Sequence, residues 1–168
     1  AGAAVLIFAL GDAFYWRSVY HANVDHMVHA RIAAAQFIDT HLPAGAIIAA
    51  HDIGAIKYYS NRTIVDLGGL VDAKFTEYQR RRALDRYLLN HHVDFLAIPG
   101  KHSTEKTPLY DFLAFLRLDK SPLYEWHEIA SFEMPHDEWA LGNPPTGNYL
   151  PSVKIYKVDW TRRASYPG

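Results

Sequence analysis

Apolar residues recur every three or four positions between Val24 and Leu42, with polar residues between them. This spacing places the apolar side chains on one side of a helix, and it therefore predicts an amphipathic helix. The helix should end near Pro43 and Gly45, because proline does not continue a helix and glycine is common just beyond one. This helix is the long N-terminal element of the predicted fold.

After Gly45 the pattern changes to short, continuous apolar runs separated by helical segments. Such runs are typical of strands that are buried on both faces of a parallel sheet. The predicted order is strand, helix, strand, helix, strand, and the segments are 46–50, Ile53–Ser60, 63–67, 75–90 and 93–98. This order predicts parallel strands joined by right-handed crossovers.

The C-terminal third alternates apolar and polar residues in two stretches, residues 123–134 and Ser152–Trp160. Alternation is typical of strands with one exposed face, so the two stretches predict an antiparallel pair at the edge of the sheet. A further helix is predicted over residues 109–118. Residues 135–151 form a loop that is longer than connections usually are, and such loops are either functional or mobile.

These elements together predict a three-layer, Rossmann-like α/β fold. It has a parallel sheet of about three strands, extended by the antiparallel C-terminal pair and preceded by the long N-terminal helix. A chain of 168 residues is close to the usual size of one domain. We assign residues 21–160 to a single α/β domain, residues 1–20 to the end of a transmembrane helix or an N-terminal tether, and residues 161–168 to a tail.

The first residues carry a separate signal. Residues 1–10 are apolar, and Phe14, Tyr15, Trp16 and Arg17 follow them. Ten apolar residues do not span a bilayer, which takes about 20, but they match the outer end of a transmembrane helix followed by side chains typical of the headgroup region. The alternative is a hydrophobic helix packed on the domain or on a neighbouring molecule. The sequence does not begin with methionine, and we expect it to be a fragment or a processed chain.

The composition fits a folded domain and excludes several classes of function. Hydrophobic residues make up 49% of the chain and charged residues 21%, which is ordinary for a globular protein. The formal net charge of −1 does not supply the basic surface of a nucleic-acid-binding protein, so we expect no nucleic-acid partner. The absence of cysteine excludes disulfides and cysteine-ligated zinc.

His26 and His29 share a helix face, but zinc usually needs three or four ligands. We interpret them as a surface pair, and we expect no metal and no cofactor in this chain.

The candidate ligand-binding residues follow the three parallel strands. His51 and Asp52 come after the first strand, Asp66 after the second, and Lys101 and His102 after the third. Ligands of open α/β sheets bind beyond the carboxyl ends of the strands, where these five side chains should meet. Carboxylates and histidines at one edge can divide the roles of acid and base.

Structural roles are the alternative for the two aspartates. Asp52 directly precedes a helix, and its carboxylate can cap the helix amino end. Asp66 can organise the turn at Gly68 and Gly69. The chain has no three-glycine dinucleotide fingerprint, phosphate loop or serine nucleophile elbow, so we assign no catalytic residue.

A charged run, EYQRRRALDRY, lies in the predicted helix 75–90. Glu77 is spaced to pair with Arg80 and Arg81 on the helix surface. The run is interpreted as a solvated helix face, and contact with an anionic membrane surface is the alternative.

Residues 30–72 read ARIAAAQFIDTHLPAGAIIAAHDIGAIKYYSNRTIVDLGGLVD. They resemble the start of the C-terminal extracytoplasmic domain of bacterial multi-span membrane glycosyltransferases that use polyprenyl-phosphate sugars, a group related to protein mannosyltransferases and lipid A aminoarabinose transferases. The pattern that carries the resemblance is a helix, LPAGA, a strand ending in HDIGAI, and IVDLGGLVD, and it covers about a quarter of the chain. The resemblance implies a domain that follows the last transmembrane helix on the periplasmic side of the cytoplasmic membrane. It also implies that the catalytic acidic residue lies in an earlier part of the protein.

Three functions follow as hypotheses. The resemblance implies a domain that helps to form or cover the acceptor site of a membrane glycosyltransferase, with the membrane and a glycan, lipid-linked sugar or protein acceptor as partners. The residues at the strand ends suggest instead a self-contained enzyme that binds a small ligand. The N-terminal segment also fits the anchor of a non-enzymatic subunit of a membrane assembly.

Overall fold

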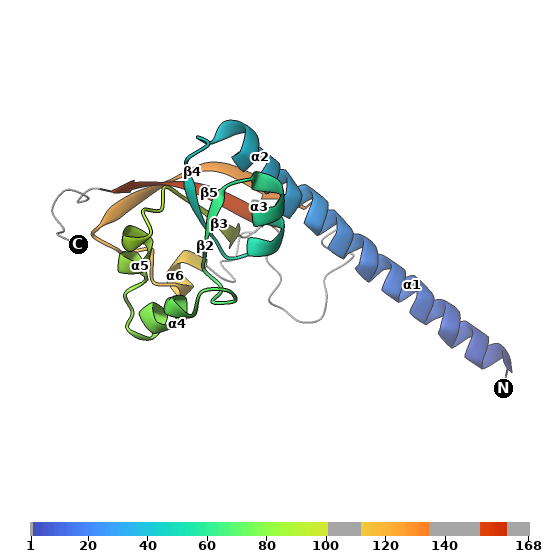
Figure 1. The fold of residues 1–168 in the computed structure, drawn as a ribbon. Coiled ribbons are helices and arrows are strands. Elements are labelled where there is room, and N and C mark those ends of the chain that lie inside the picture. Colours follow the sequence, from blue (N-terminus) through green and yellow to red (C-terminus); the bar gives the residue numbers. More distant parts are fainter. Residues whose placement is uncertain (1, 101–111, 135–151, 161–168) are drawn as a thin grey trace.

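The computed structural model describes residues 2–100, 112–134 and 152–160, which form a mixed sheet between two layers of helices (Figure 1). The strands are β1 (Ile47–Ala50), β2 (Thr63–Asp66), β3 (Phe95–Gly100), β4 (Tyr124–Glu133) and β5 (Ser152–Trp160). Their order in the sheet is β2-β1-β3-β5-β4. β1 is parallel to β2 and β3, whereas β5 is antiparallel to β3 and β4. The predicted α/β fold, with its parallel strands and antiparallel C-terminal pair, is confirmed.

The helices are α1 (Gly2–His26), the π-helical segment η1 (Met27–Ile32), α2 (Ala33–His41), α3 (Ile53–Ser60), α4 (Ala73–Arg80), α5 (Leu84–Asn90) and α6 (Phe112–Phe115). The first three form one helical rod, because His26, Ile32 and Ala33 at their junctions keep right-handed helical backbone angles. The apolar N-terminal segment and the predicted amphipathic helix are therefore parts of a single element.

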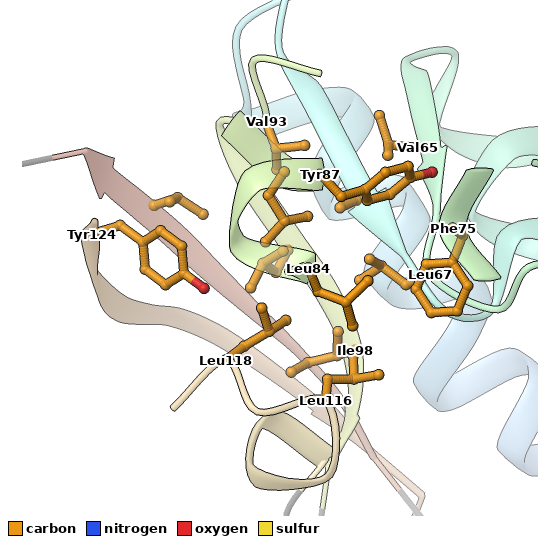
Figure 2. Packing of buried hydrophobic residues seen from close by; sticks show 14 of the residues in the cluster. Val65, Leu67, Phe75, Leu84, Tyr87, Val93, Ile98, Leu116, Leu118 and Tyr124 are labelled. Carbon is orange, nitrogen blue, oxygen red and sulfur yellow. The ribbon is translucent and has the colours of Figure 1, made fainter. Parts of the chain in front are cut away.

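The strands divide their side chains between two cores, as the two-residue period of a strand requires. In β1, Ile48 and Ala50 face the core under η1, α2 and α3, whereas Ala49 faces the core under α4, α5 and α6. The first core contains small residues on the rod, Ala30, Ala34 and Ala35, together with Ile38. The second core contains more large side chains, several of which are shown in Figure 2.

The helical rod runs antiparallel to the three parallel strands. Arg31, in η1, contacts Asp52, which lies just after β1. Near the other end of the rod, Asp39 and Leu42 contact Arg62, which lies just before β2. The carboxyl ends of the parallel strands therefore point towards the end of the domain from which α1 projects (Figure 1).

Two predicted helices differ from the structure. Residues 75–90 were expected to form one helix, but they contain α4 and α5 with a turn between them. Arg82 in this turn has a φ of 55°, a left-handed conformation that ends a helix. The turn allows Leu84, Tyr87 and Leu88 to re-enter the core.

The helix predicted over residues 109–118 is shorter in the described residues, where α6 spans Phe112–Phe115. Arg117 has a φ of 56°, which ends the helical conformation before residue 118. The strand boundaries agree with the predictions to within two residues. Residues 109–111, the predicted loop 135–151 and the tail 161–168 lie outside the described residues.

Candidate functional site

The carboxyl ends of β1 and β2 bring His51, Asp52 and Asp66 to one edge of the sheet, as the sequence predicted. Lys101 and His102, the other two candidates, lie outside the described residues. The site can therefore be examined on its first three members and on the loop that joins β2 to α4. We call this loop, residues 67–72, the rim loop.

The Asp66 carboxylate is buried and organises the rim loop. One oxygen accepts hydrogen bonds from the backbone N–H groups of Gly68 (2.7 Å) and Gly69 (3.1 Å), and the other accepts from Val71 (2.7 Å) and Asp72 (3.3 Å). Burial raises the pKa of Asp66, but these backbone hydrogen bonds outweigh it, so the pKa lies below the ordinary value. The predicted role in the turn is confirmed, and the carboxylate is already engaged by the protein itself.

Two glycines of the rim loop have little room for a side chain. Gly69 has a φ of 68°, and a Cβ atom there would lie 3.0 Å from Cδ1 of Phe75. A Cβ atom on Gly68 would lie 3.3 Å from the Asp66 carboxylate. Both the left-handed backbone and the close packing therefore favour residues without a side chain.

The end of the rim loop is fixed by Asp72 and Tyr87. The Asp72 carboxylate caps α4 by accepting a hydrogen bond from the backbone N–H of Lys74 (2.9 Å). The Tyr87 hydroxyl donates to the other oxygen of Asp72 (2.9 Å) and also lies 3.1 Å from the carbonyl oxygen of Asp66. Burial and this contact with Asp72 raise the pKa of Tyr87, which stays protonated at neutral pH. These contacts fix the rim loop at both ends.

Asp52 does not cap α3, and the predicted cap is wrong. Asp52 occupies the position before the helix, but its side chain makes no capping hydrogen bond. Its carboxylate instead forms an ion pair with Arg31, and both side chains are partly exposed. Because the partner lies on another helix, nothing in the local sequence around Asp52 indicates this pairing.

His51 is half-buried between the sheet and α6. Its ring meets Phe112 edge-on, with the ring centroids 4.7 Å apart. Burial lowers the pKa of His51, although the carboxylates of Asp52 and Asp66 act in the opposite direction. The lowered pKa favours the neutral form of the His51 ring.

The rim loop also presents two apolar side chains that the sequence interpretation overlooked. Leu70 and Val71 are each 77% exposed. The pattern around them was interpreted only as a turn at Gly68 and Gly69. Two adjacent apolar residues beside a glycine pair were the available signal.

A second exposed apolar surface covers α1. Val5, Leu6, Ile7 and Phe8 are between 60% and 80% exposed. Successive helical residues are about 100° apart, so four consecutive exposed residues cover the whole circumference. Leu10, Phe14, Tyr15, Trp16 and Tyr20 are also exposed. Within the described ranges, no helix has both the length and the apolar character needed to cross a membrane.

A hollow of about 510 Å³ lies at the opposite end of the sheet, and Asp94, Lys157, Asp159 and Trp160 contribute to its lining. Its charged groups already have partners in the protein. Lys157 and Asp159 pair at 2.7 Å, and Asp94 accepts a hydrogen bond from the backbone N–H of Ile47 (3.0 Å). The hollow is remote from the predicted ligand-binding residues, and we assign no ligand to it.

Metal binding has no support in the part of the chain that the structure describes. No group of three or more histidine, aspartate or glutamate side chains there is arranged to hold an ion. His26 is buried, whereas the sequence interpretation placed it on the surface together with His29. The predicted surface pair is therefore wrong for His26. The predicted surface charge run is better supported, because Glu77 and Arg81 form an exposed ion pair at 2.7 Å.

Comparison with known proteins gives a match to a protein family. No curated protein and no solved structure matches the chain. Residues 17–156, most of the chain, match a family described as a domain of unknown function. The chain belongs to this family, DUF8728.

Proposed function

We propose that this chain is the extracytoplasmic α/β domain of a membrane glycosyltransferase-like protein. In this role it helps to form or cover the acceptor site, while another part of the protein carries out the transfer. The observation that carries the proposal is α1, which projects from the domain (Figure 1). Its first turns expose apolar side chains on every side.

A helix that is apolar all round is stable when a membrane or a protein core covers it. Covering one large apolar side chain is worth about 1.5–3 kcal/mol, and α1 exposes several of them. Residues 2–10 rise about 13 Å along the helix axis, roughly the depth of one leaflet. Tyr15, Trp16 and Arg17 follow, and such side chains are typical of the headgroup region. These properties favour a lipid bilayer as the environment of the first turns of α1.

The polar residues at the strand ends support a role without chemistry of their own. The Asp66 carboxylate accepts four backbone hydrogen bonds, and Asp52 is paired with Arg31. An enzyme of the self-contained kind would need such carboxylates available for its substrate. The internal use of both groups therefore favours a domain that positions or covers a site rather than one that catalyses.

The resemblance of residues 30–72 supports the transferase assignment. This segment contains α2, β1, α3, β2 and the rim loop, so it corresponds to one continuous part of the domain. In the proposed role, the domain lies on the periplasmic side of the cytoplasmic membrane. Its partners are the membrane and a glycan, lipid-linked sugar or protein acceptor, with no nucleic acid and no cofactor of its own.

The membrane tether can be tested with single-cysteine labelling, because the chain has no cysteine. Phe8→Cys and Tyr58→Cys are matched positions, since each native side chain is 80% exposed. Each variant of the full chain is labelled with an environment-sensitive fluorophore and mixed with vesicles of phosphatidylethanolamine and phosphatidylglycerol. We expect the label at position 8 to shift to the blue and to be quenched by spin-labelled lipids, and the label at position 58 to remain in water. A label at position 8 that stays in water with vesicles present would contradict the tether.

The transferase assignment needs its own test. We expect the gene region upstream of Ala1 to encode several hydrophobic spans, and removal of residues 43–160 from that protein to abolish transfer to its acceptor. A start codon directly before Ala1 would contradict the assignment. So would unchanged transfer by the protein that lacks the domain.

A further inference from the structure

We propose that the rim loop is a second membrane-contact site, in which Leu70 and Val71 enter the boundary between lipid headgroups and acyl chains. This inference rests on the proposed function, because α1 defines the side on which the bilayer lies. It adds that the domain rests on the membrane with the edge that carries the strand ends, rather than standing free on its helix.

The first step is the direction of the rod relative to the sheet. The contacts of Arg31 with Asp52, and of Asp39 with Arg62, show that the rod and the parallel strands run in opposite directions. The loops that follow β1 and β2 therefore lie at the end of the domain from which α1 leaves (Figure 1). A bilayer that holds the first turns of α1 is on the same side as the rim loop.

The second step is the chemistry of the loop tip. Leu70 and Val71 are each 77% exposed, and they stand next to each other on a loop whose shape the protein fixes. Backbone N–H groups that enter a lipid environment need partners, because water is scarce there. Asp66 supplies partners to the N–H groups of Gly68, Gly69, Val71 and Asp72. The tip therefore presents apolar side chains while most of its amide hydrogens are directed into the protein.

The third step is the surroundings of the loop. Lys74 is exposed in the first turn of α4, four residues beyond Leu70. A lysine at this position can reach the phosphate of an anionic headgroup. Phe115 is also exposed, and it belongs to α6, whose Phe112 packs against His51 at the same edge of the sheet. Apolar and basic side chains thus occur together at this end of the domain.

The fourth step is the orientation that contact requires. The rim loop lies to one side of the rod and level with Arg31, which follows Arg17 by about 20 Å of helix. For the loop to reach the bilayer, α1 must tilt steeply towards it. Membrane helices tilt by about 20° on average and by up to about 40°, and the contact requires a tilt near the upper end of this range. A lipid surface is preferred to a protein partner as the occupant because the proposed function already requires a bilayer on this side of the domain.

The test uses Leu70→Cys, labelled with an environment-sensitive fluorophore, in the full chain on vesicles of phosphatidylethanolamine and phosphatidylglycerol. Tyr58→Cys is the control, because Tyr58 lies near the end of α3, away from the carboxyl ends of β1 and β2. We expect the label at position 70 to shift to the blue and to be quenched by lipids that carry a spin label near the headgroup. The label at position 58 should show neither change. In the Leu70→Cys background, Val71→Ser should reduce the quenching without changing the melting temperature.

The outcomes separate this inference from the proposed function. If the label at position 8 is quenched by lipid but the label at position 70 stays in water, the membrane contact of the rim loop is wrong and the tether stands. If neither label responds to lipid, the tether fails and this inference fails with it. A blue shift at position 70 that depends on protein concentration and not on vesicles would identify a second copy of the chain as the partner, and would also overturn the inference.

Discussion

The two ends of the helical rod place similar side chains in opposite environments. Ile38, in α2, is fully buried against the sheet, whereas Ile7, in α1, is 70% exposed. The residues around Ile38 form an amphipathic face with small alanines towards β1, while the residues around Ile7 are apolar on all sides. The comparison shows that one helical element has two kinds of surface: the folded domain covers the apolar side chains at one end, whereas those at the other end are exposed.

The rim loop occupies an intermediate position in this comparison. Its apolar tip is exposed like α1, but its backbone is held by buried groups like α2. Substitutions of the groups that hold the backbone should therefore change the shape of the loop and leave Leu70 and Val71 in place. Substitutions of Leu70 or Val71 should remove the apolar side chains and leave the shape unchanged. Substitutions of both kinds test the contrast between the packed and exposed regions.

The largest loss of stability is expected from Ile38→Ala in α2, and the same substitution at Ile7 in α1 is the comparison. Ile38→Ala should lower the free energy of unfolding by about 2–5 kcal/mol, because it removes buried methyl groups and leaves a cavity. Ile7→Ala should change it by no more than about 0.5 kcal/mol, since the side chain is 70% exposed. Chemical denaturation in a mild detergent measures both values. Equal losses would show that α1 packs on the domain in solution.

Asp66→Asn should produce the next largest effect. The amide retains one acceptor oxygen but turns an NH₂ group towards backbone N–H donors, so we expect a loss of about 2–3 kcal/mol in the free energy of unfolding. Asp52→Asn is the control, because its ion pair with Arg31 is partly exposed and worth at most about 1 kcal/mol. A reversed order of the two losses would mean that the rim loop does not depend on Asp66.

The pH dependence of the free energy of unfolding should also show the contribution of the Asp66 carboxylate. The pKa of Asp66 is lowered in the folded protein, so the stability it contributes is present above the carboxylate's unfolded value of about 3.9 and is lost as pH falls through the lower folded value. We expect the Asp66→Asn protein to show a flatter decline of stability below about pH 4 than the unaltered chain. Denaturation midpoints measured between neutral pH and acid compare the two proteins. Parallel curves would contradict the role of the ionised carboxylate.

The smallest effect concerns the backbone of the rim loop. Gly69→Ala should cost about 1–2 kcal/mol, because the φ of 68° is unfavourable for alanine and the new Cβ meets the Phe75 ring. Gly54→Ala is the matched control, since it lies in α3 with no heavy atom within 4 Å of a Cβ. There we expect a gain of up to about 1 kcal/mol from helix propensity. The melting temperature should therefore fall for Gly69→Ala and rise for Gly54→Ala.

The sequence predicted the elements whose side chains are buried on both faces. β1 and β2 stood out as continuous apolar runs, since each strand has helices above and below it. The break between α4 and α5 was missed, because arginine is a good helix former and the left-handed Arg82 leaves no mark in the pattern. Local spacing reports burial well, but it does not report where a chain turns to re-enter its core.

The candidate site was predicted in position but not in detail. The order of strands and helices was sufficient to bring His51, Asp52 and Asp66 to one edge. The partner of Asp52 could not be predicted, since Arg31 is distant in the chain and reaches Asp52 only through the packing of η1 on α3. The exposure of Leu70 and Val71 could not be predicted either, because a short apolar pair has the same pattern whether it is covered or not.

The π-helical segment η1 sets the rotational phase of the whole molecule. A π turn holds one more residue than an α turn, so the side chains of α1 are rotated by about 100° about the rod axis relative to an uninterrupted α-helix. Deleting one residue between Met27 and Ile32 would restore α-helical winding and leave the domain at the same angle to α1, because the π turn accommodates one extra residue. Winding all of the present residues as an α-helix would instead turn the domain around its own helix by about 100°. Any structure fixed to α1 therefore faces a particular side of the sheet, and η1 determines which side it is.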